Sequence, residues 1–188
     1  MTPYQRFCEK WQGGCGSGLC EKARRVYARG RIPCDVLFVG EAPGESENVL
    51  GVPFAGPAGF LLDRIVAQSI GEVHYPITVG FANLVCCIPR ESDGNKAAEP
   101  DDKEIKACGP RLVEFINLCK PRLIVCVGAM ARDWLDPKVR PRVDIPKEIP
   151  QVDITHPAAI LRANTASQGM LVRRCILTVR NAVDQYVV

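Results

Sequence analysis

The sequence predicts an α/β fold with three layers, α/β/α, in which helices flank a four-stranded parallel sheet. Four short segments are apolar without alternation, which is typical of strands that are covered on both faces. Segments with helical periodicity separate these strands and follow the last one, and this β-α-β-α-β-α-β-α order favours parallel pairing. The predicted strands are residues 36–39 (VLFV), 77–82 (ITVGFA), 123–127 (LIVCV) and 152–155 (VDIT).

The predicted helices are amphipathic, with apolar residues three and four positions apart. They contain the apolar stripes of residues 60–69, 105–119 and 172–183, and a short helix is expected over residues 128–135. Pro100, Asp101 and Asp102 mark the start of the second stripe, because a missing N–H group and negative charge are favourable in the first turn of a helix. Residues 1–188 are therefore expected to form one domain.

The composition is that of an ordinary globular protein, with 47% hydrophobic and 24% charged residues. The chain shows neither a signal peptide nor an apolar run of roughly 18–20 residues, so we expect a cytoplasmic protein without a membrane span. The net charge of +3 permits a local phosphate-binding patch but does not predict one. Ten cysteines in a reducing compartment favour metal or cluster ligation over a disulfide framework.

The carboxyl ends of parallel strands meet at one edge of a sheet, where open α/β sheets bind their ligands. This rule gathers residues 40–44, 83–89, 128 and 156–162 into one expected site. Residues 40–59 are rich in glycine and proline, which lets backbone N–H groups approach a ligand. Neither a Walker A motif nor the GxGxxG spacing is present, so a nucleoside triphosphate is disfavoured. A tight connection between strand and helix is the alternative interpretation.

His156 is the histidine that this rule places at the expected site. The sequence has two histidines, and the other, His74, lies in a predicted loop. His156 follows the last predicted strand and is fixed by Pro157, which favours a functional role over a structural one.

Several motifs occur in order along nearly the whole chain. They are GEAPGESEN with GVPFAGPAGFLLD, then ANLVCCIP, AEPDDKEIKAC, PRLIVCVGAMA and HPAAILR. In this combination the sequence resembles the iron–sulfur uracil-DNA glycosylases, family 4 of their superfamily. The resemblance implies a monofunctional DNA glycosylase that flips uracil, or a related pyrimidine, out of DNA and hydrolyses its N-glycosidic bond to leave an abasic site. It also implies a monomer whose partner is DNA containing uracil or a modified pyrimidine.

The resemblance assigns roles to five residues. Glu41 would position or activate water and orient the sugar, and Phe54 would stack on the flipped base. Asn83 would read the pyrimidine edge, since its amide offers both a donor and an acceptor. His156 would donate a hydrogen bond to the base O2 as negative charge collects on the leaving pyrimidine. Ala42, in the same base-binding region, stands where other branches carry a water-activating acidic residue, so the implied excision is largely dissociative.

Other interpretations of these residues stay open. Phe54 is also compatible with a core residue, Asn83 with a turn and Glu41 with a helix cap. Asn48 stands at a commonly acidic position, and the loop between residues 87 and 108 is longer than usual, which leaves the preferred base open. The alternative functions are a glycosylase for a modified base and a protein that binds uracil-containing DNA with little turnover.

For DNA contact, the resemblance implies a loop over residues 159–162 that enters the duplex. Ala159 begins this loop, Leu161 would fill the vacated stack and Arg162 would lie near a phosphate. Four arginines before the first strand are a second candidate for phosphate contact, with a solvated basic face as the alternative; they are Arg24, Arg25, Arg29 and Arg31.

The resemblance further implies a [4Fe–4S] cluster bound by cysteine thiolates, with a cluster-binding segment over about residues 1–34. The implied ligands are Cys15, Cys20, Cys87 and Cys108, and Cys8 is a reserve candidate for the N-terminal pair. A zinc ion held by the same four thiolates is the alternative. The remaining cysteines are interpreted as packing residues, namely Cys34, Cys86, Cys119, Cys126 and Cys175.

Overall fold

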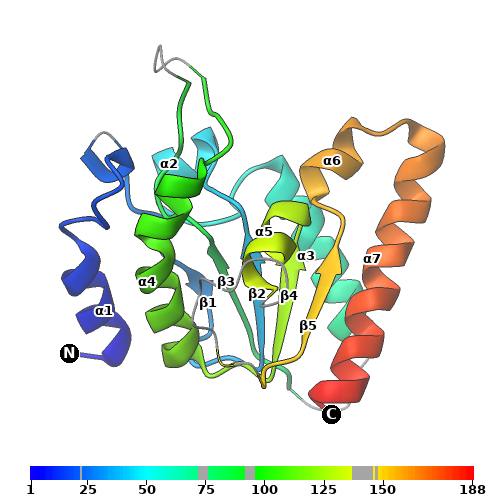
Figure 1. The fold of residues 1–188 in the computed structure, drawn as a ribbon. Helices are drawn as coiled ribbons and strands as arrows, with labels where there is room; N and C mark the ends of the chain where they lie inside the picture. The colour runs from blue at the N-terminus through cyan, green and yellow to red at the C-terminus, as the bar shows by residue number, and fades with distance from the viewer. Residues whose placement is uncertain (22, 72–75, 92–95, 137–145, 147) are drawn as a thin grey trace.

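The computed structural model describes residues 1–21, 23–71, 76–91, 96–136, 146 and 148–188. Within these residues the central sheet has five strands in the order β1-β3-β2-β4-β5 (Figure 1). Four of them are parallel, namely β2 (Val36–Gly40), β3 (Val79–Asn83), β4 (Leu123–Val127) and β5 (Gln151–Ile154). The predicted α/β class and its four parallel strands are confirmed.

The predicted strand number was one too low. β1 (Arg29–Gly30) pairs antiparallel with β3 and places Arg29 opposite Phe81. A strand of two residues is too short to show an apolar pattern, so periodicity could not reveal it. β1 covers the edge of β3, which would otherwise be open.

The helices expected from the apolar stripes are present. They are α3 (Pro57–Ile70), α4 (Asp102–Cys119), α5 (Ala129–Leu135) and α7 (Thr165–Tyr186). The structure adds α1 (Pro3–Trp11), α2 (Glu45–Leu50), α6 (Pro157–Arg162) and a 3₁₀ turn, η1 (Leu19–Glu21). None of the described helices is long and apolar enough to cross a membrane.

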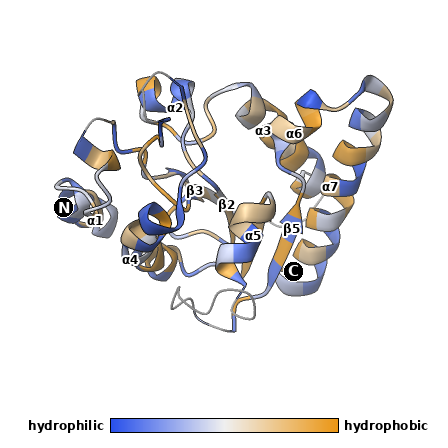
Figure 2. Cartoon of the chain, turned by 45° about the horizontal axis from the view of Figure 1, so that its top comes forward, coloured by the Kyte–Doolittle hydropathy of each residue, from blue (hydrophilic) through white to orange (hydrophobic). Residues whose placement is uncertain are grey.

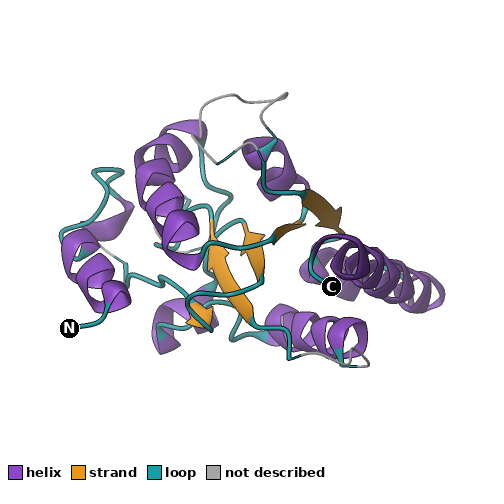
Figure 3. Ribbon diagram, turned by 90° about the horizontal axis from the view of Figure 1, so that it is seen from below, coloured by secondary structure: helices purple, strands orange, loops and turns teal. Residues whose placement is uncertain are grey.

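Two hydrophobic cores, one on each face of the sheet, produce the three layers. Leu37 and Val39 belong to the core shared with α1, α4 and α5, whereas Val36 and Phe38 belong to the core shared with α3, α6 and α7. Figure 3 shows the sheet between these two sets of helices. Hydrophilic and hydrophobic bands alternate along α4 and α7 (Figure 2), as expected of helices with one buried face.

The loop expected over residues 159–162 is a helix instead. Pro157 occupies the first turn of α6, and His156 caps it by accepting the N–H of Ala158 on Nδ1 at 3.2 Å. A proline in the first turn and a side-chain acceptor at the N-cap are both signals for helix initiation. The sequence thus contained the start of α6, but its six residues were too few to show a helical stripe.

Candidate active site and metal site

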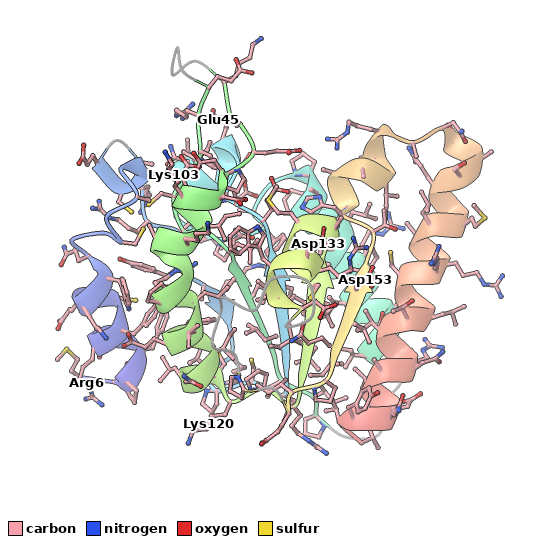
Figure 4. All side chains as sticks on the ribbon, viewed as in Figure 1. Arg6, Glu45, Lys103, Lys120, Asp133 and Asp153 are labelled. Atoms are coloured by element: carbon pink, nitrogen blue, oxygen red, sulfur yellow. The ribbon has the colours of Figure 1, made fainter. Side chains whose placement is uncertain are left out.

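A cavity of about 360 Å³ lies at the carboxyl ends of the parallel strands. Its walls come from segments far apart in sequence: Glu41 follows β2, Glu99 precedes α4, Asp133 lies on α5 and His156 follows β5. Figure 4 shows Asp133 on the α5 side of this region, while Lys120 lies at the opposite end of the molecule. The structure therefore brings Glu41 and His156 together in a cavity of the size that binds small ligands.

The ring nitrogen of His156 that is available to a ligand is Nε2. Its Nδ1 accepts the backbone N–H of Ala158, and a neutral imidazole with one acceptor nitrogen carries its proton on the other, Nε2. Burial lowers the pKa of His156, and the positive charge of Arg162 lowers it further. His156 is therefore a neutral imidazole near pH 7 and offers Nε2–H as a hydrogen-bond donor.

Glu41 places a carboxyl group at the cavity. Burial raises the pKa of Glu41, and the nearby negative charge of Glu99 raises it further. A carboxylate with a raised pKa is a stronger base than an exposed one. Glu41 can therefore orient a water molecule and accept a proton from it, and sequence reasoning did not anticipate that Glu99 would face it.

Asn83 carries an amide without a partner. Its side chain is 1% exposed, and neither Oδ1 nor Nδ2 forms a hydrogen bond with the described residues. A Cβ at Gly40 would lie 2.6 Å from Asn83 Oδ1 and 2.6 Å from Phe54 Cζ. Only glycine at position 40 leaves room for the amide and the ring together. Because buried polar groups are nearly always paired in native proteins, this amide has the properties of a site for a polar ligand.

Phe54 is held in a backbone conformation that side chains seldom adopt. Its φ angle is 55°, and its side chain is 8% exposed. The ring packs edge-on against Phe81, with 6.0 Å between the ring centroids. Left-handed backbone at a bulky residue is unfavourable and is concentrated at functional sites. Phe54 and Asn83 meet at Gly40, directly before Glu41, so both groups lie at the end of β2, beside the cavity but not among the residues that line it.

Other predicted site residues lie around this centre in different environments. Ala42 is partly buried and packs against the core on the α4 side, and it is not among the residues that line the cavity. Ala159, Leu161 and Arg162 are exposed on α6, whereas Ile160 is buried and anchors the helix. An apolar and a cationic side chain therefore project from the edge of the sheet that holds the cavity. His74 lies outside the described residues.

One side chain that sequence reasoning missed, that of Glu47, holds the glycine-rich loops in place. Glu47 accepts the N–H of Gly44 on Oε2 at 3.0 Å and the N–H of Gly56 on Oε1 at 2.8 Å. It therefore joins the loop after β2 to the loop that carries Phe54. Glu47 supplies one half of a capping box by accepting the N–H of the N-cap Gly44, but glycine has no side chain for the other half, so the motif is not visible in the sequence.

Arg29, on β1, contacts the loop that carries Phe54. Its Nε donates to the carbonyl of Pro53 at 2.8 Å, and its guanidinium lies 3.9 Å from the ring centroid of Phe81. Arg24 donates to the carbonyl of Val49 at 2.8 Å. These two arginines therefore hold backbone carbonyls of the protein, although Arg24 is exposed like Arg31. No sequence pattern distinguishes them.

Five cysteine thiols converge between η1, the segment after β3 and α4. Cys20 Sγ lies 3.0 Å from Cys87 Sγ and 3.8 Å from Cys15 Sγ. Cys86 Sγ lies 3.8 Å from Cys108 Sγ and 3.9 Å from Cys87 Sγ. The four expected ligands are therefore brought together, and Cys86, which was expected to be a packing residue, lies among them. Cys20, Cys86 and Cys87 place their sulfurs within 4.8 Å of one another.

The donor set fits a soft metal ion or an iron–sulfur cluster. All of the converging groups are thiols, and those of Cys20, Cys86, Cys87 and Cys108 are buried. Hydrogen bonds from the thiol of Cys15, and then from those of Cys86 and Cys87, lower the pKa of Cys20, whereas the pKa of each of the other four thiols is raised. A lowered thiol pKa favours the thiolate, the form that binds metals, so Cys20 is the thiol most easily deprotonated among the five.

The other cysteines lie apart from this group. Cys8 is partly buried and packs near Tyr4 and Tyr27 rather than beside the five converging thiols. The remaining four are buried in the cores, as expected of packing residues; they are Cys34, Cys119, Cys126 and Cys175.

The sequence is similar to that of known proteins. The family model "Uracil DNA glycosylase superfamily" matches residues 28–179. The type-4 uracil-DNA glycosylase of Saccharolobus solfataricus is 32% identical over 119 residues, or 63% of this chain and 52% of that protein. The type-4 uracil-DNA glycosylase of Sulfurisphaera tokodaii is 30% identical over 132 residues, or 70% of this chain and 53% of that protein. The chain thus spans about half the length of these curated relatives.

A solved structure is also similar in fold. The crystal structure of the wild-type SMUG2 of Pedobacter heparinus superposes with a TM-score of 0.62 and covers 81% of this chain and 77% of its own. The sequences are 15% identical, so this likeness concerns the fold alone.

Proposed function

Because the chain belongs to the uracil DNA glycosylase superfamily, we propose that it is a monofunctional DNA glycosylase that extrudes uracil from DNA and hydrolyses its N-glycosidic bond. The product is an abasic site in DNA. In this proposal residues 1–188 act as one domain and residues 1–34 bind the metal centre, and the protein works as a monomer.

The observation that carries the proposal is the unpaired amide of Asn83 beside the ring of Phe54. A pyrimidine presents both a donor and an acceptor on one edge and an apolar face on each side. An amide that has no protein partner matches the edge, and the Phe54 ring matches the face. A base inside this site would satisfy both polar atoms of Asn83, which removes the unfavourable free energy of burying them unpaired.

The chemistry follows from His156 and Glu41. When the bond between the base and C1′ breaks, its electron pair stays on the base, and negative charge develops on O2. The Nε2–H of His156 donates to this oxygen, and one such preorganised donor typically contributes about 2.7–4 kcal/mol to the lowering of the barrier. Glu41 orients the water that adds to C1′ and accepts its proton, which its raised pKa favours.

Residues on α6 would keep the base extruded. Leu161 is exposed on α6, which follows His156, and insertion of an apolar side chain offsets the unstacking that base flipping requires. Arg162 follows it and is placed to contact a phosphate. Ala159, one turn earlier and also exposed, lets the DNA backbone approach α6 closely.

For the metal centre we propose a [4Fe–4S] cluster held by Cys15, Cys20, Cys87 and Cys108. When bound, it joins the segment around η1 to the segment after β3 and to α4. The alternative is a single zinc ion held by the same four thiolates. Iron, sulfide and zinc analysis of anaerobically purified protein separates the two.

The function is tested by excision from oligonucleotides that carry a single uracil, thymine, 5-hydroxymethyluracil or hypoxanthine. Alkali then cleaves the strand at each abasic site. Cleavage at uracil that is lost in His156→Ala supports the proposal. DNA binding without cleavage of any of these substrates would overturn it in favour of a binding protein or of a glycosylase for another base.

A further inference from the structure

Arg111 is a buried charge that the proposed chemistry does not use. It lies on α4 three residues after Cys108, so both side chains are on the same face of the helix. It is 0% exposed and is the largest of the fully buried side chains. Its Nη2 donates to the carbonyls of Asn83 and Leu84, each at 2.7 Å.

Among the described residues the rest of the guanidinium has no oxygen acceptor, although, against the effect of burial, a hydrogen bond to the Cys108 thiol raises the pKa of Arg111. Nε and Nη1 of Arg111 are buried without hydrogen bonds to oxygen, and none of the ion pairs among the described residues involves Arg111. A guanidinium cannot lose its proton inside a protein. Two carbonyl dipoles do not neutralise it, and an uncompensated buried charge is strongly unfavourable. Negative charge is therefore required close to this side chain.

The cysteine group supplies this charge. Cys108 is one helical turn before Arg111 on the same face of α4, so its sulfur and the guanidinium are neighbours. Thiols that bind a metal become thiolates, and four thiolates around either proposed metal centre leave net negative charge. The positive charge of the Arg111 guanidinium is thus compensated by the negative charge of the thiolates when metal is bound.

We propose that Arg111 is the charge partner of the metal-bound thiolates and, through the carbonyls of Asn83 and Leu84, the positioning residue that links the metal site to the base-reading amide. This inference rests on the proposed function, because holding Asn83 in one position matters only if its amide binds the base. The guanidinium suits both tasks, since its rigid fork directs donors along two edges at once. Lysine at this position would keep the charge but could not reproduce the fork.

The test compares Arg111→Lys and Arg111→Met with Arg122→Met. Arg122 is the matched control, because it also donates to a backbone carbonyl, that of Val187, but lies at the opposite end of the sheet. Each protein is purified anaerobically for three measurements: the rate of metal release to a chelator, the reduction midpoint potential if iron is present, and kcat and KM on a uracil-containing oligonucleotide.

We expect Arg111→Met to release metal about 10- to 100-fold faster than the unmodified protein, as loss of such an outer partner typically does. Its midpoint potential should be lower, because removal of a positive charge disfavours reduction. Arg111→Lys should retain the potential and most of the metal, while kcat/KM falls about tenfold.

Two results would overturn the inference. If Arg111→Met leaves the metal-release rate and the potential unchanged, Arg111 is not the charge partner of the thiolates. If Arg111→Lys leaves kcat/KM unchanged, Arg111 does not position Asn83. If Arg111→Met does not fold, Arg111→Gln, which also removes the charge, decides the first question by its release rate relative to Arg122→Met, and Arg111→Lys still decides the second. Metal release and potential do not depend on excision, so a failure of the proposed function is recognised separately.

Discussion

Gly59 lies directly beneath the carbonyl of Phe54: a Cβ at position 59 would be 1.8 Å from Phe54 O. No rotation of a side chain relieves this contact, because both partners are backbone. Gly59 therefore fixes the left-handed conformation that aims the ring of Phe54.

Gly59→Ala is expected to destabilise the protein and to impair excision together. Forced overpacking typically costs about 1–3 kcal/mol, and relief of the clash requires the Phe54 segment to move. Thermal unfolding and kcat/KM should both report the change. Gly169→Ala is the control, since it lies on the exposed side of α7 with open space around it, and it should raise stability by about 0.5–1 kcal/mol with full activity. Equal effects of the two substitutions would contradict the role of Gly59.

Asn83→Ala should affect stability and activity in opposite directions. The amide has no partner in the free protein, so its removal eliminates an unfavourable buried polar group, and the melting temperature should stay the same or rise. Excision should fall by about 10²- to 10³-fold, as for loss of one preorganised polar contact. Exposed Asn181→Ala should change neither quantity. A large loss of stability in Asn83→Ala would show that the amide is structural.

His156 should make stability depend on pH. Its pKa is lowered in the folded protein, so between that value and about 6.5 the unfolded chain binds more protons. Stability should therefore fall as the pH drops below about 6.5 and level off below the folded pKa. His156→Gln should lose this slope. Because Glu41, Glu99, Asp133 and Arg162 remain in both proteins, the difference between the two pH profiles is the contribution of His156 alone.

The five thiols predict a specific pattern of metal loss. Cys86 Sγ lies close to both Cys87 and Cys108, so it can complete a four-sulfur set when Cys15 is removed. Cys15→Ser should retain most of its metal, whereas Cys15→Ser/Cys86→Ser should lose it. Cys175→Ser, in the opposite core, should load fully. Identical metal content in the single and double variants would contradict a ligand role for Cys86.

Leu161 and Leu177 form a matched pair, because each is 45% exposed. Leu161→Ala should lower excision from double-stranded DNA more than from single-stranded DNA, since only the duplex requires unstacking. Leu177→Ala should leave both rates unchanged, and neither substitution should alter the melting temperature by much. Equal losses on the two substrates would argue against insertion of Leu161 into the duplex.

The sequence predicted the parts of the fold that repeat a physical pattern. The four parallel strands were recognisable because strands buried on both faces are apolar throughout, and the edge that holds Glu41 and His156 followed from their parallel order. The position of Cys86 was not predictable in this way. Alternation along a strand would place Cys86 and Cys87 on opposite sides, but β3 ends at Asn83 and the chain then bends, so both thiols reach the same space.

Arg111 shows a second limit of sequence patterns. It lies on the buried side of α4 together with Cys108 and Leu112. An arginine in an amphipathic helix normally indicates the solvent side. Only the partners of the side chain, which come from segments far away in sequence, reveal that the charge is buried.

The sulfur contact between Cys20 and Cys87 also has a consequence for the order of assembly during synthesis. These two residues are 67 positions apart, and Cys108 follows later still. In the proposed centre Cys108 is the last ligand along the chain, so this ligand set is complete only after β2 and β3 have left the ribosome. The segment that carries Cys15 and Cys20 is therefore synthesised well before the partners that hold it in place.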